Sequence, residues 1–406
     1  MGGVYPPWGR VIASDGWLRW VVVDDAGVVV EPIGVFLRDF AASGNRPLSV
    51  RSYAYDLLRW WRWLVLVEVR WDRATSTEVR EFVLWLQHTR KPRRSPRTGS
   101  AVTAGRVNPV TGKRYLGDGY EPRTVRHSNA VIRAFYAYWI ERGDGPLINP
   151  VPAERRGGRQ GNEHHNPMRP FEADGRLRYN PKVARRLPRA MPDARWNELF
   201  AALRSNRDRA ILAVAISTAA RAAEVLGVRG LDLDWGEQLV RVVRKGTRAE
   251  QWLPASSDAF VWIRLYLADL GTPRAPDQPL WWTLRRRDHG QGLVLQPLNY
   301  EALRAVLRRV NALLGTNWSM HDLRHTCALR MARDKRLSMR DVQTILGHSR
   351  LSTTADVYAV EEQEQVIRRV AEHLAAREET IDEPAPAPAA GYDGADLAVL
   401  FGEQIR

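Results

Sequence analysis

Prolines and glycines are concentrated between residues 144 and 190, and they divide this chain into two parts. Proline removes a backbone donor and glycine adds conformational freedom, so neither helix nor strand periodicity survives there. The pattern predicts a linker over 144–190 with a separately folded domain on each side. A chain of 406 residues is long enough for two or three domains that each bury a core.

The part before the linker is predicted to be a small helical bundle over residues 31–143. Apolar residues recur at helical spacing in four segments. Ser49 is expected to cap the second segment, and Thr75 followed by Glu78 has the capping-box pattern at the start of the third. The fourth is expected from about residue 122 to 142.

Both ends of the chain differ from the rest in composition. Residues 1–30 are predicted as an N-terminal extension that forms a hairpin, with strands at 20–23 and 28–30 around an Asp-Asp-Ala-Gly turn. Residues 379–406 form an acidic tail that begins with alternating proline and alanine. The tail either packs on a neighbouring subunit or is disordered.

A long basic loop is expected between the third and fourth helices of the bundle. It contains Arg93, Arg94 and Arg97 and few acidic residues. These arginines are candidates for contact with a DNA backbone. The alternative is a solvated, partly disordered insertion, which is the usual state of a charge run.

The part after the linker, residues 191–378, is predicted to be mainly α-helical with one small antiparallel β-sheet. Short β-rich segments predict three strands: 231–235, 239–243 and 251–254. The helices are expected at about 196–203, 208–226, 257–270, 299–314, 320–334, 339–348 and 360–378. This domain should form its own core.

The net charge of +15 favours a polyanionic partner, either nucleic acid or an anionic membrane surface. A basic protein without such a partner is the alternative. No apolar run reaches the roughly 18 to 20 residues of a spanning helix, and the first ten residues lack a signal-peptide pattern. Since the only cysteine, Cys327, cannot form an intrachain disulfide, a cytoplasmic protein in a reducing compartment is expected.

Polar residues suited to phosphodiester chemistry lie in three clusters near the C-terminus, with two basic residues upstream. Arginine stays protonated and its planar fork matches phosphate oxygens, while a tyrosine hydroxyl can form a covalent intermediate. The residues occur in this order: Arg221, Lys245, His321, Arg324, His348 and Tyr358.

This order of residue types resembles that of the tyrosine recombinases, the phage integrase family of DNA breaking and joining enzymes. The resemblance covers about residues 190–375, with a weaker likeness to the family's core-binding domain over 31–143. It implies a C-shaped clamp of two domains around double-stranded DNA. It also implies a homotetramer that acts on two paired DNA sites.

The resemblance also implies a role for each residue of the phosphate site. Phosphodiester exchange builds up negative charge on the non-bridging oxygens, which preorganised cations stabilise. Arg221 and Arg324 are expected to supply those cations, and Glu224 to orient Arg221 without reacting. His321 would accept the tyrosine proton or bond the phosphate, while His325 could be structural.

The remaining roles concern the nucleophile, the leaving group and the DNA backbone. Tyr358 is the expected nucleophile, and His348 the expected donor to the scissile phosphate. Lys245 is the expected general acid for the leaving 5′ oxygen, because a guanidinium with a pKa above about 12 is a poor proton donor. Arg244 and Arg248, beside Lys245, are expected to contact the DNA backbone.

One departure from the family's pattern lies just before the first arginine. Family members often have Thr-Gly-Leu-Arg, whereas this chain has Thr218, Ala219, Ala220 and Arg221. Alanine favours helix, so the helix is expected to continue through this point. Only local geometry should be affected.

Two histidine pairs raise the question of a metal site. His321 and His325 resemble the zinc-protease pattern His-Glu-x-x-His, but an aspartate replaces the glutamate and Arg324 would stand beside the metal. His164 and His165 lack a third ligand at useful spacing. No metal is therefore expected.

Two other functions are compatible with the same residues. One is a nicking-closing enzyme of the type IB topoisomerase kind, and the other is a non-catalytic DNA-binding protein of the same fold. The expected reaction conserves energy in a 3′-phosphotyrosyl bond, so no cofactor is expected. The primary prediction is a site-specific DNA recombinase or integrase.

Overall fold

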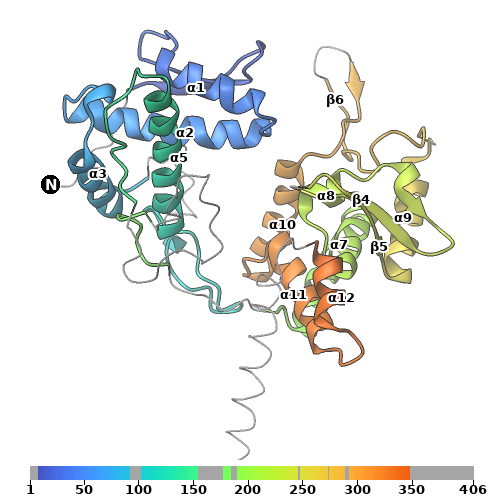
Figure 1. The fold of residues 1–406 in the computed structure, drawn as a ribbon. Helices are drawn as coiled ribbons and strands as arrows, with labels where there is room; N and C mark the ends of the chain where they lie inside the picture. Colours follow the sequence, from blue (N-terminus) through green and yellow to red (C-terminus); the bar gives the residue numbers. More distant parts are fainter. Residues whose placement is uncertain are drawn as a thin grey trace, which may run out of the picture. The chain divides into compact units, whose positions relative to one another are not determined.

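The computed structural model is mainly helical with small antiparallel sheets, which confirms the predicted fold class (Figure 1). It divides between Arg185 and Arg186 into two units, and each is described by itself. The structure describes residues 8–91, 102–153, 177–183, 190–245, 247–272, 274–288 and 292–347. Within these residues, every helix is too short or too polar to cross a membrane.

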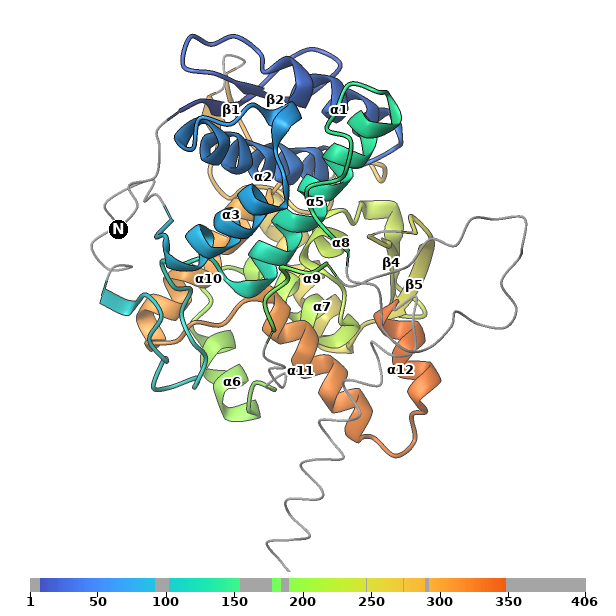
Figure 2. The same ribbon diagram turned by 60° about the vertical axis from the view of Figure 1, so that its left-hand side comes forward.

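The first unit is a helical bundle with a β-hairpin at its start. Its elements are β1 (Arg10–Ala13), β2 (Trp20–Val23), α1 (Glu31–Ala42), α2 (Pro47–Leu66), a 3-10 turn (Trp71–Arg73), α3 (Ser76–His88) and α5 (Pro122–Glu141). The two 20-residue helices, α2 and α5, pack against each other (Figure 2). Buried aromatic rings fill the space between them, and the indole of Trp60 donates a hydrogen bond to the Tyr136 hydroxyl at 2.9 Å.

The starts of α2 and α3 test two capping predictions. At α3 the capping box is confirmed, because the Thr75 backbone N–H donates to Glu78 at 2.7 Å and the Thr75 hydroxyl accepts from Thr77. At α2 the prediction that Ser49 caps the helix is wrong. The helix begins at Pro47, whose fixed φ and missing N–H suit a first helical position.

The main partner of β2 in the N-terminal hairpin is not the predicted strand. β2 pairs along its length with β1, with Arg10 opposite Val23 and Ala13 opposite Trp20. The predicted pairing with 28–30 is present only in short form, as a bridge from Val29 to Val23 with backbone hydrogen bonds on either side of it. The hairpin is held to α2 by Arg62, whose guanidinium donates to two backbone carbonyls just before β1.

Segments at both ends of the predicted linker pack on the first unit. Val151 is fully buried in that unit's core. The Asn129 side chain of α5 donates to the Tyr179 carbonyl at 3.2 Å and to Asn180 at 3.0 Å. The boundaries of the linker and the domains stay predictions.

The described part of the basic loop is folded. The Asn108 carboxamide oxygen accepts hydrogen bonds from the backbone N–H groups of Val110 and Thr111, and Val107 bridges Arg114. The loop's candidate DNA contacts, Arg93, Arg94 and Arg97, lie outside the described residues.

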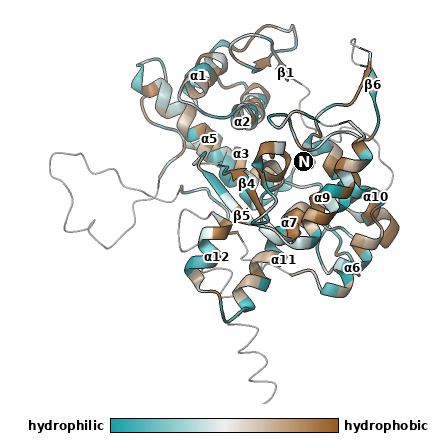
Figure 3. Ribbon diagram, turned by 90° about the vertical axis from the view of Figure 1, so that its right-hand side faces the viewer, coloured by the Kyte–Doolittle hydropathy of each residue, from teal (hydrophilic) through white to brown (hydrophobic). Residues whose placement is uncertain are grey.

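The second unit packs helices against one face of a three-stranded antiparallel sheet. Its helices are α6 (Asp193–Ala201), α7 (Asn206–Thr218), α8 (Ala222–Leu226), α9 (Ser257–Leu270), α10 (Tyr300–Leu314), α11 (Met320–Arg333) and α12 (Met339–Leu346). Its strands are β3 (Leu233–Asp234), β4 (Leu239–Val243) and β5 (Glu250–Pro254), with a small extra pair, β6 (Arg287–Asp288) and β7 (Leu293–Val294). α7 is buried on most of its surface, and α9, which carries apolar segments, packs beside it (Figure 3).

The helix predicted over 208–226 is interrupted. α7 ends at Thr218, and Ala219 has a left-handed backbone with φ of 53°. The expectation that alanine would continue the helix is therefore wrong. Ala219 occupies the C-terminal cap position where glycine is usual, and α8 begins three residues later.

Candidate active site

The break between α7 and α8 places Arg221 at a helix start. Arg221 has an extended backbone and is the residue before α8. Its backbone N–H donates to Glu224 at 2.9 Å, and its guanidinium donates to the other carboxylate oxygen at 2.8 Å. The Arg221 side chain is 32% exposed, whereas that of Glu224 is almost fully buried. The carboxylate therefore fixes the arginine while leaving part of it accessible.

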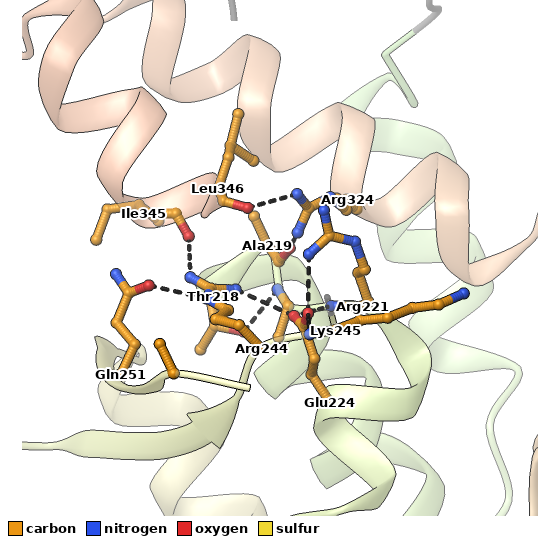
Figure 4. A network of polar contacts seen from close by, with 12 residues as sticks. Thr218, Ala219, Arg221, Glu224, Arg244, Lys245, Gln251, Arg324, Ile345 and Leu346 are labelled. Carbon is orange, nitrogen blue, oxygen red and sulfur yellow. Dashed lines mark hydrogen bonds and ion pairs between the residues drawn. The ribbon is translucent and has the colours of Figure 1, made fainter. Parts of the chain in front are cut away.

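Glu224 also receives donors from the β4 end of the sheet (Figure 4). The guanidinium of Arg244 and the backbone N–H of Lys245 each donate to it at 3.0 Å. Burial by itself would raise the pKa of Glu224, but hydrogen bonds from Lys245 and Arg221 hold the pKa below its ordinary value. Glu224 is thus an ionised acceptor shared by two elements.

Arg324 comes from α11 and lies beside Arg221 (Figure 4). It is 6% exposed, and its two terminal nitrogens donate to the carbonyls of Ala219 and Leu346, the latter at 2.7 Å. Burial, together with the nearby charge of Arg221, lowers the pKa of Arg324 to about 10. The group is still a cation at neutral pH.

His321 and His325 lie one turn apart on α11. Their Nε2 atoms are 2.8 Å apart and their rings meet edge to face. A hydrogen bond at that distance needs one Nε2 to carry a hydrogen and the other to present a lone pair. Among the described residues there is no group of three or more His, Cys, Asp or Glu side chains arranged to hold a metal.

Arg244 does not have the surface position expected of a DNA contact. It is only 3% exposed, and it donates to Glu224, to Gln251 at 2.8 Å and to the carbonyl of Ile345. Burial lowers the pKa of Arg244, although the charge of Glu224 opposes this. Gln251, which also donates to the Thr344 carbonyl, was missed because nothing in its local sequence distinguishes it from a solvated strand residue.

The segment between β4 and β5 presents Lys245 and Arg248 to solvent. The Lys245 side chain extends away from Glu224, while its backbone is held by that carboxylate (Figure 4). Arg248 has a left-handed backbone, with φ of 58°, and its N–H donates to the Arg244 carbonyl at 3.1 Å. The Lys245 ammonium is therefore exposed to solvent, while its backbone is fixed by the hydrogen bond to Glu224.

Two of the predicted catalytic residues, His348 and Tyr358, lie outside the described residues. The residue before His348 is Gly347, which caps α12 with φ of 60°. Gly347 lies directly against the Arg244 side chain.

The described side chains form a cation cluster, defined as Arg221, Arg244 and Arg324 around Glu224. Three positive charges against one negative charge leave an excess of two. Guanidinium groups in such a partly buried place bind a phosphate or another oxyanion more strongly than they do in open water. The arrangement can hold an anion and stabilise added negative charge on it.

The sequence matches known proteins over the same region. The model of the phage integrase family matches residues 190–365. Transposase A from transposon Tn554 of Staphylococcus aureus is 21% identical over 350 residues, which is 84% of this chain and 90% of that protein. The tyrosine recombinase XerC of Chlamydia pneumoniae is 28% identical over 311 residues, which is 76% of this chain and 87% of XerC.

Solved structures share the fold. XerH site-specific recombinase bound to palindromic difH substrate superposes with a TM-score of 0.52 at 14% identity, over 82% of this chain and 80% of that one. The Tn1549 transposon integrase in complex with transposon right end DNA gives 0.51 at 13% identity, over 84% and 99%. The order of residue types, the family match and these relatives together lead to one conclusion: residues 190–365 of this chain form a domain of the phage integrase family, and the chain is similar to tyrosine recombinases.

Proposed function

We propose that this DNA recombinase is site-specific, and that it cleaves and rejoins double-stranded DNA through a 3′-phosphotyrosyl intermediate. The observation that carries the proposal is the cation cluster, whose excess positive charge surrounds the partly exposed Arg221. A scissile phosphate bound there would contact the Arg221 guanidinium, and the buried charge of Arg324 beside it would add to the attraction.

In the proposed reaction the Tyr358 oxygen forms a bond to phosphorus, and the bond from phosphorus to the 5′ oxygen breaks. Lys245 gives its proton to that leaving oxygen, while His321 takes the tyrosine proton and His348 donates to the phosphate. The 5′ hydroxyl of a partner strand then attacks the phosphotyrosyl bond and releases Tyr358. The bond energy is kept throughout, so the exchange consumes no nucleotide and uses no metal to neutralise charge.

Exchange of strands needs two duplexes in one assembly. We therefore propose that four protomers act on two paired sites, as the resemblance to the family implies. A type IB nicking-closing enzyme would instead relax one supercoiled duplex without joining it to another. Joining of two differently labelled duplexes by the wild-type chain distinguishes the recombinase, and relaxation without joining would favour the alternative.

The nucleophile is tested by trapping the covalent intermediate. Nicked duplexes from the DNA that flanks the gene are incubated with the full chain, and protein linked to DNA is detected on a denaturing gel. We expect an adduct with wild type and none with Tyr358→Phe, because phenylalanine has no oxygen to attack phosphorus. An undiminished adduct with Tyr358→Phe, or none with wild type, rejects the mechanism.

The general acid is tested by changing the leaving group. Lys245→Ala should slow cleavage of ordinary DNA by about 10²- to 10⁴-fold, the usual contribution of general acid catalysis. A 5′-thio leaving group needs no proton, so it should restore the rate. If the rate stays low on the thio substrate, the acid is another residue.

A further inference from the structure

The last turn of α12 ends in three consecutive carbonyls that each accept a donor from another element, and Figure 4 shows the last two, those of Ile345 and Leu346. The Gln251 side chain of β5 donates to Thr344 at 2.9 Å. Arg244, directly after β4, donates to Ile345, and Arg324 of α11 donates to Leu346 at 2.7 Å. The final carbonyls of a helix lack the usual partner within the helix, so the bonds to Ile345 and Leu346 satisfy groups that would otherwise need water, while Thr344 also accepts from the Gly347 N–H at 3.0 Å.

Arg244 is the centre of this arrangement. It is buried, and its Nε donates to Gln251 at 2.8 Å while Nη1 donates to Glu224 at 3.0 Å and Nη2 to Ile345. One planar guanidinium therefore joins the sheet, α8 and the end of α12. Lysine, which presents a single ammonium group, has no rigid fork with which to make three such bonds.

Gly347, the residue after α12, packs so closely against Arg244 that a side chain there would clash. A Cβ at Gly347 would lie 2.8 Å from Nε of Arg244, closer than real Cβ contacts, and its φ of 60° also disfavours other residues. The backbone of Gly347 can thus pass closely over the guanidinium. The chain continues from this fixed point into His348.

We propose that Arg244, assisted by Gln251, is a positioning residue that clamps the end of α12 to the β4–β5 hairpin. The clamp sets the point from which the His348 segment leaves, relative to the hairpin that carries Lys245. The inference rests on the proposed roles of His348 and Lys245. It replaces the expectation that Arg244 contacts DNA, because a buried guanidinium with three protein acceptors is not presented to a phosphate.

The clamp is tested first without DNA, by amide hydrogen exchange of the full chain in Arg244→Gln. Exchange in the last turn of α12 should rise about tenfold, since the carbonyls there lose a charge-assisted partner. Arg248→Gln removes the same charge from an exposed position of the same hairpin and should leave that turn unchanged. Equal exchange in wild type and Arg244→Gln, or an equal rise in both variants, would overturn the clamp.

A second measurement separates positioning from DNA contact. The salt dependence of binding to a random-sequence duplex loses a slope of about one for each phosphate contact removed. We expect Arg244→Gln to keep the wild-type slope. A slope lower by one would assign Arg244 to a phosphate and overturn the proposal. Both this measurement and hydrogen exchange remain decisive even if wild type forms no covalent adduct, in which case the proposed function alone fails.

A third measurement uses cleavage. Arg244→Gln should lower the rate of adduct formation by about 10- to 100-fold, the cost of a misplacement near 1 Å. The 5′-thio substrate should restore Lys245→Ala but not Arg244→Gln, since the end of α12 remains displaced. Full restoration of Arg244→Gln would mean that Arg244 acts through Lys245 alone, and would overturn its role toward α12.

Gly347→Ala tests the packing while Arg244 stays in place, and a double variant then tests whether the two residues are coupled. Gly347→Ala should raise exchange at the end of α12 through both its φ and its contact with Arg244. In the Arg244→Ala background only the φ cost remains, so the added effect of Gly347→Ala should be smaller. Equal effects in the two backgrounds would contradict the close packing on which the clamp depends.

Discussion

Both units bury carboxylates among cations, and Asp56 of the first unit and Glu224 of the second differ in the balance of charge around them. In the first unit, Asp56 accepts from Arg59, His127 and Ser128. In the second, Glu224 accepts from Arg221, Arg244 and the Lys245 backbone, and Arg324 lies nearby.

The exposure of the partners differs as well. Around Asp56, Arg59 is 16% exposed and His127 is 46% exposed, so water can reach the cationic partners. Around Glu224, Arg244 is almost wholly buried and Arg221 alone opens to solvent. The negative charge of Asp56 is balanced by Arg59 and His127, which suits a structural link between α2 and α5. The excess positive charge around Glu224 suits a site that binds an anion.

The largest effect should come from removing the charge of Glu224. Glu224→Gln keeps the side chain's shape but leaves Arg244 buried without a countercharge, which costs about 3–5 kcal/mol. Urea unfolding read by hydrogen exchange in each unit measures this, with the loss confined to the second unit. A loss below about 1 kcal/mol would mean that water already screens the pair.

Asp56→Asn is the matched substitution in the first unit and should cost less, about 1–3 kcal/mol. Its partners reach solvent, so they can be hydrated when the carboxylate is lost. The same exchange experiment applies, and adduct formation per folded molecule should not change. Equal losses in the two units would remove the distinction drawn between the two carboxylates.

Acid should weaken the second unit through Glu224. Because its folded pKa lies below the ordinary value of 4.5, its contribution is fully present above that value and is lost as pH falls through the folded pKa. The unfolding free energy of the second unit should therefore drop on acidification below 4.5 in wild type, and less in Glu224→Gln. Parallel pH curves for the two proteins would contradict this assignment.

Alkali should weaken the first unit by the smallest amount. The hydrogen bond to Asp56 raises the pKa of His127 above 6.5, although burial opposes it. Its stabilisation is fully present below 6.5 and is lost as pH rises through the higher folded pKa. His127→Gln should abolish this slope in unfolding experiments from pH 6 upward. A slope that persists in the variant must arise from another group.

Local sequence patterns correctly predicted those elements whose stability depends on residues close together in the chain. The Thr75 and Glu78 capping box, the helical stripes and the three-stranded sheet all follow from contacts within a few residues, and all are present. The main partner of β2, which is β1, was not predicted, although the shorter pairing with 28–30 is present. A contact with α2 more than 50 residues away, from Arg62 to the Trp8 carbonyl, holds the start of β1 in place.

The site shows the same limit. Arginine and lysine in a hairpin are usually solvated, so the sequence predicted Arg244 on the surface. Its buried position depends on a contact with the Ile345 carbonyl, which lies 101 residues further along the chain. Ala219 has high helix propensity, yet its backbone turns left-handed where Arg324 binds its carbonyl. The order of residue types predicted the family, while these distant contacts set the geometry.

The span of those contacts has a consequence for synthesis. Arg324 and Ala219 are separated by 105 residues, and that loop must close before the cation cluster exists. A chain still emerging from the ribosome, or one cut short before α11, holds Arg221, Glu224 and Arg244 but lacks Arg324. We therefore expect that the anion site stays incomplete until α11 has docked on the rest of the second unit.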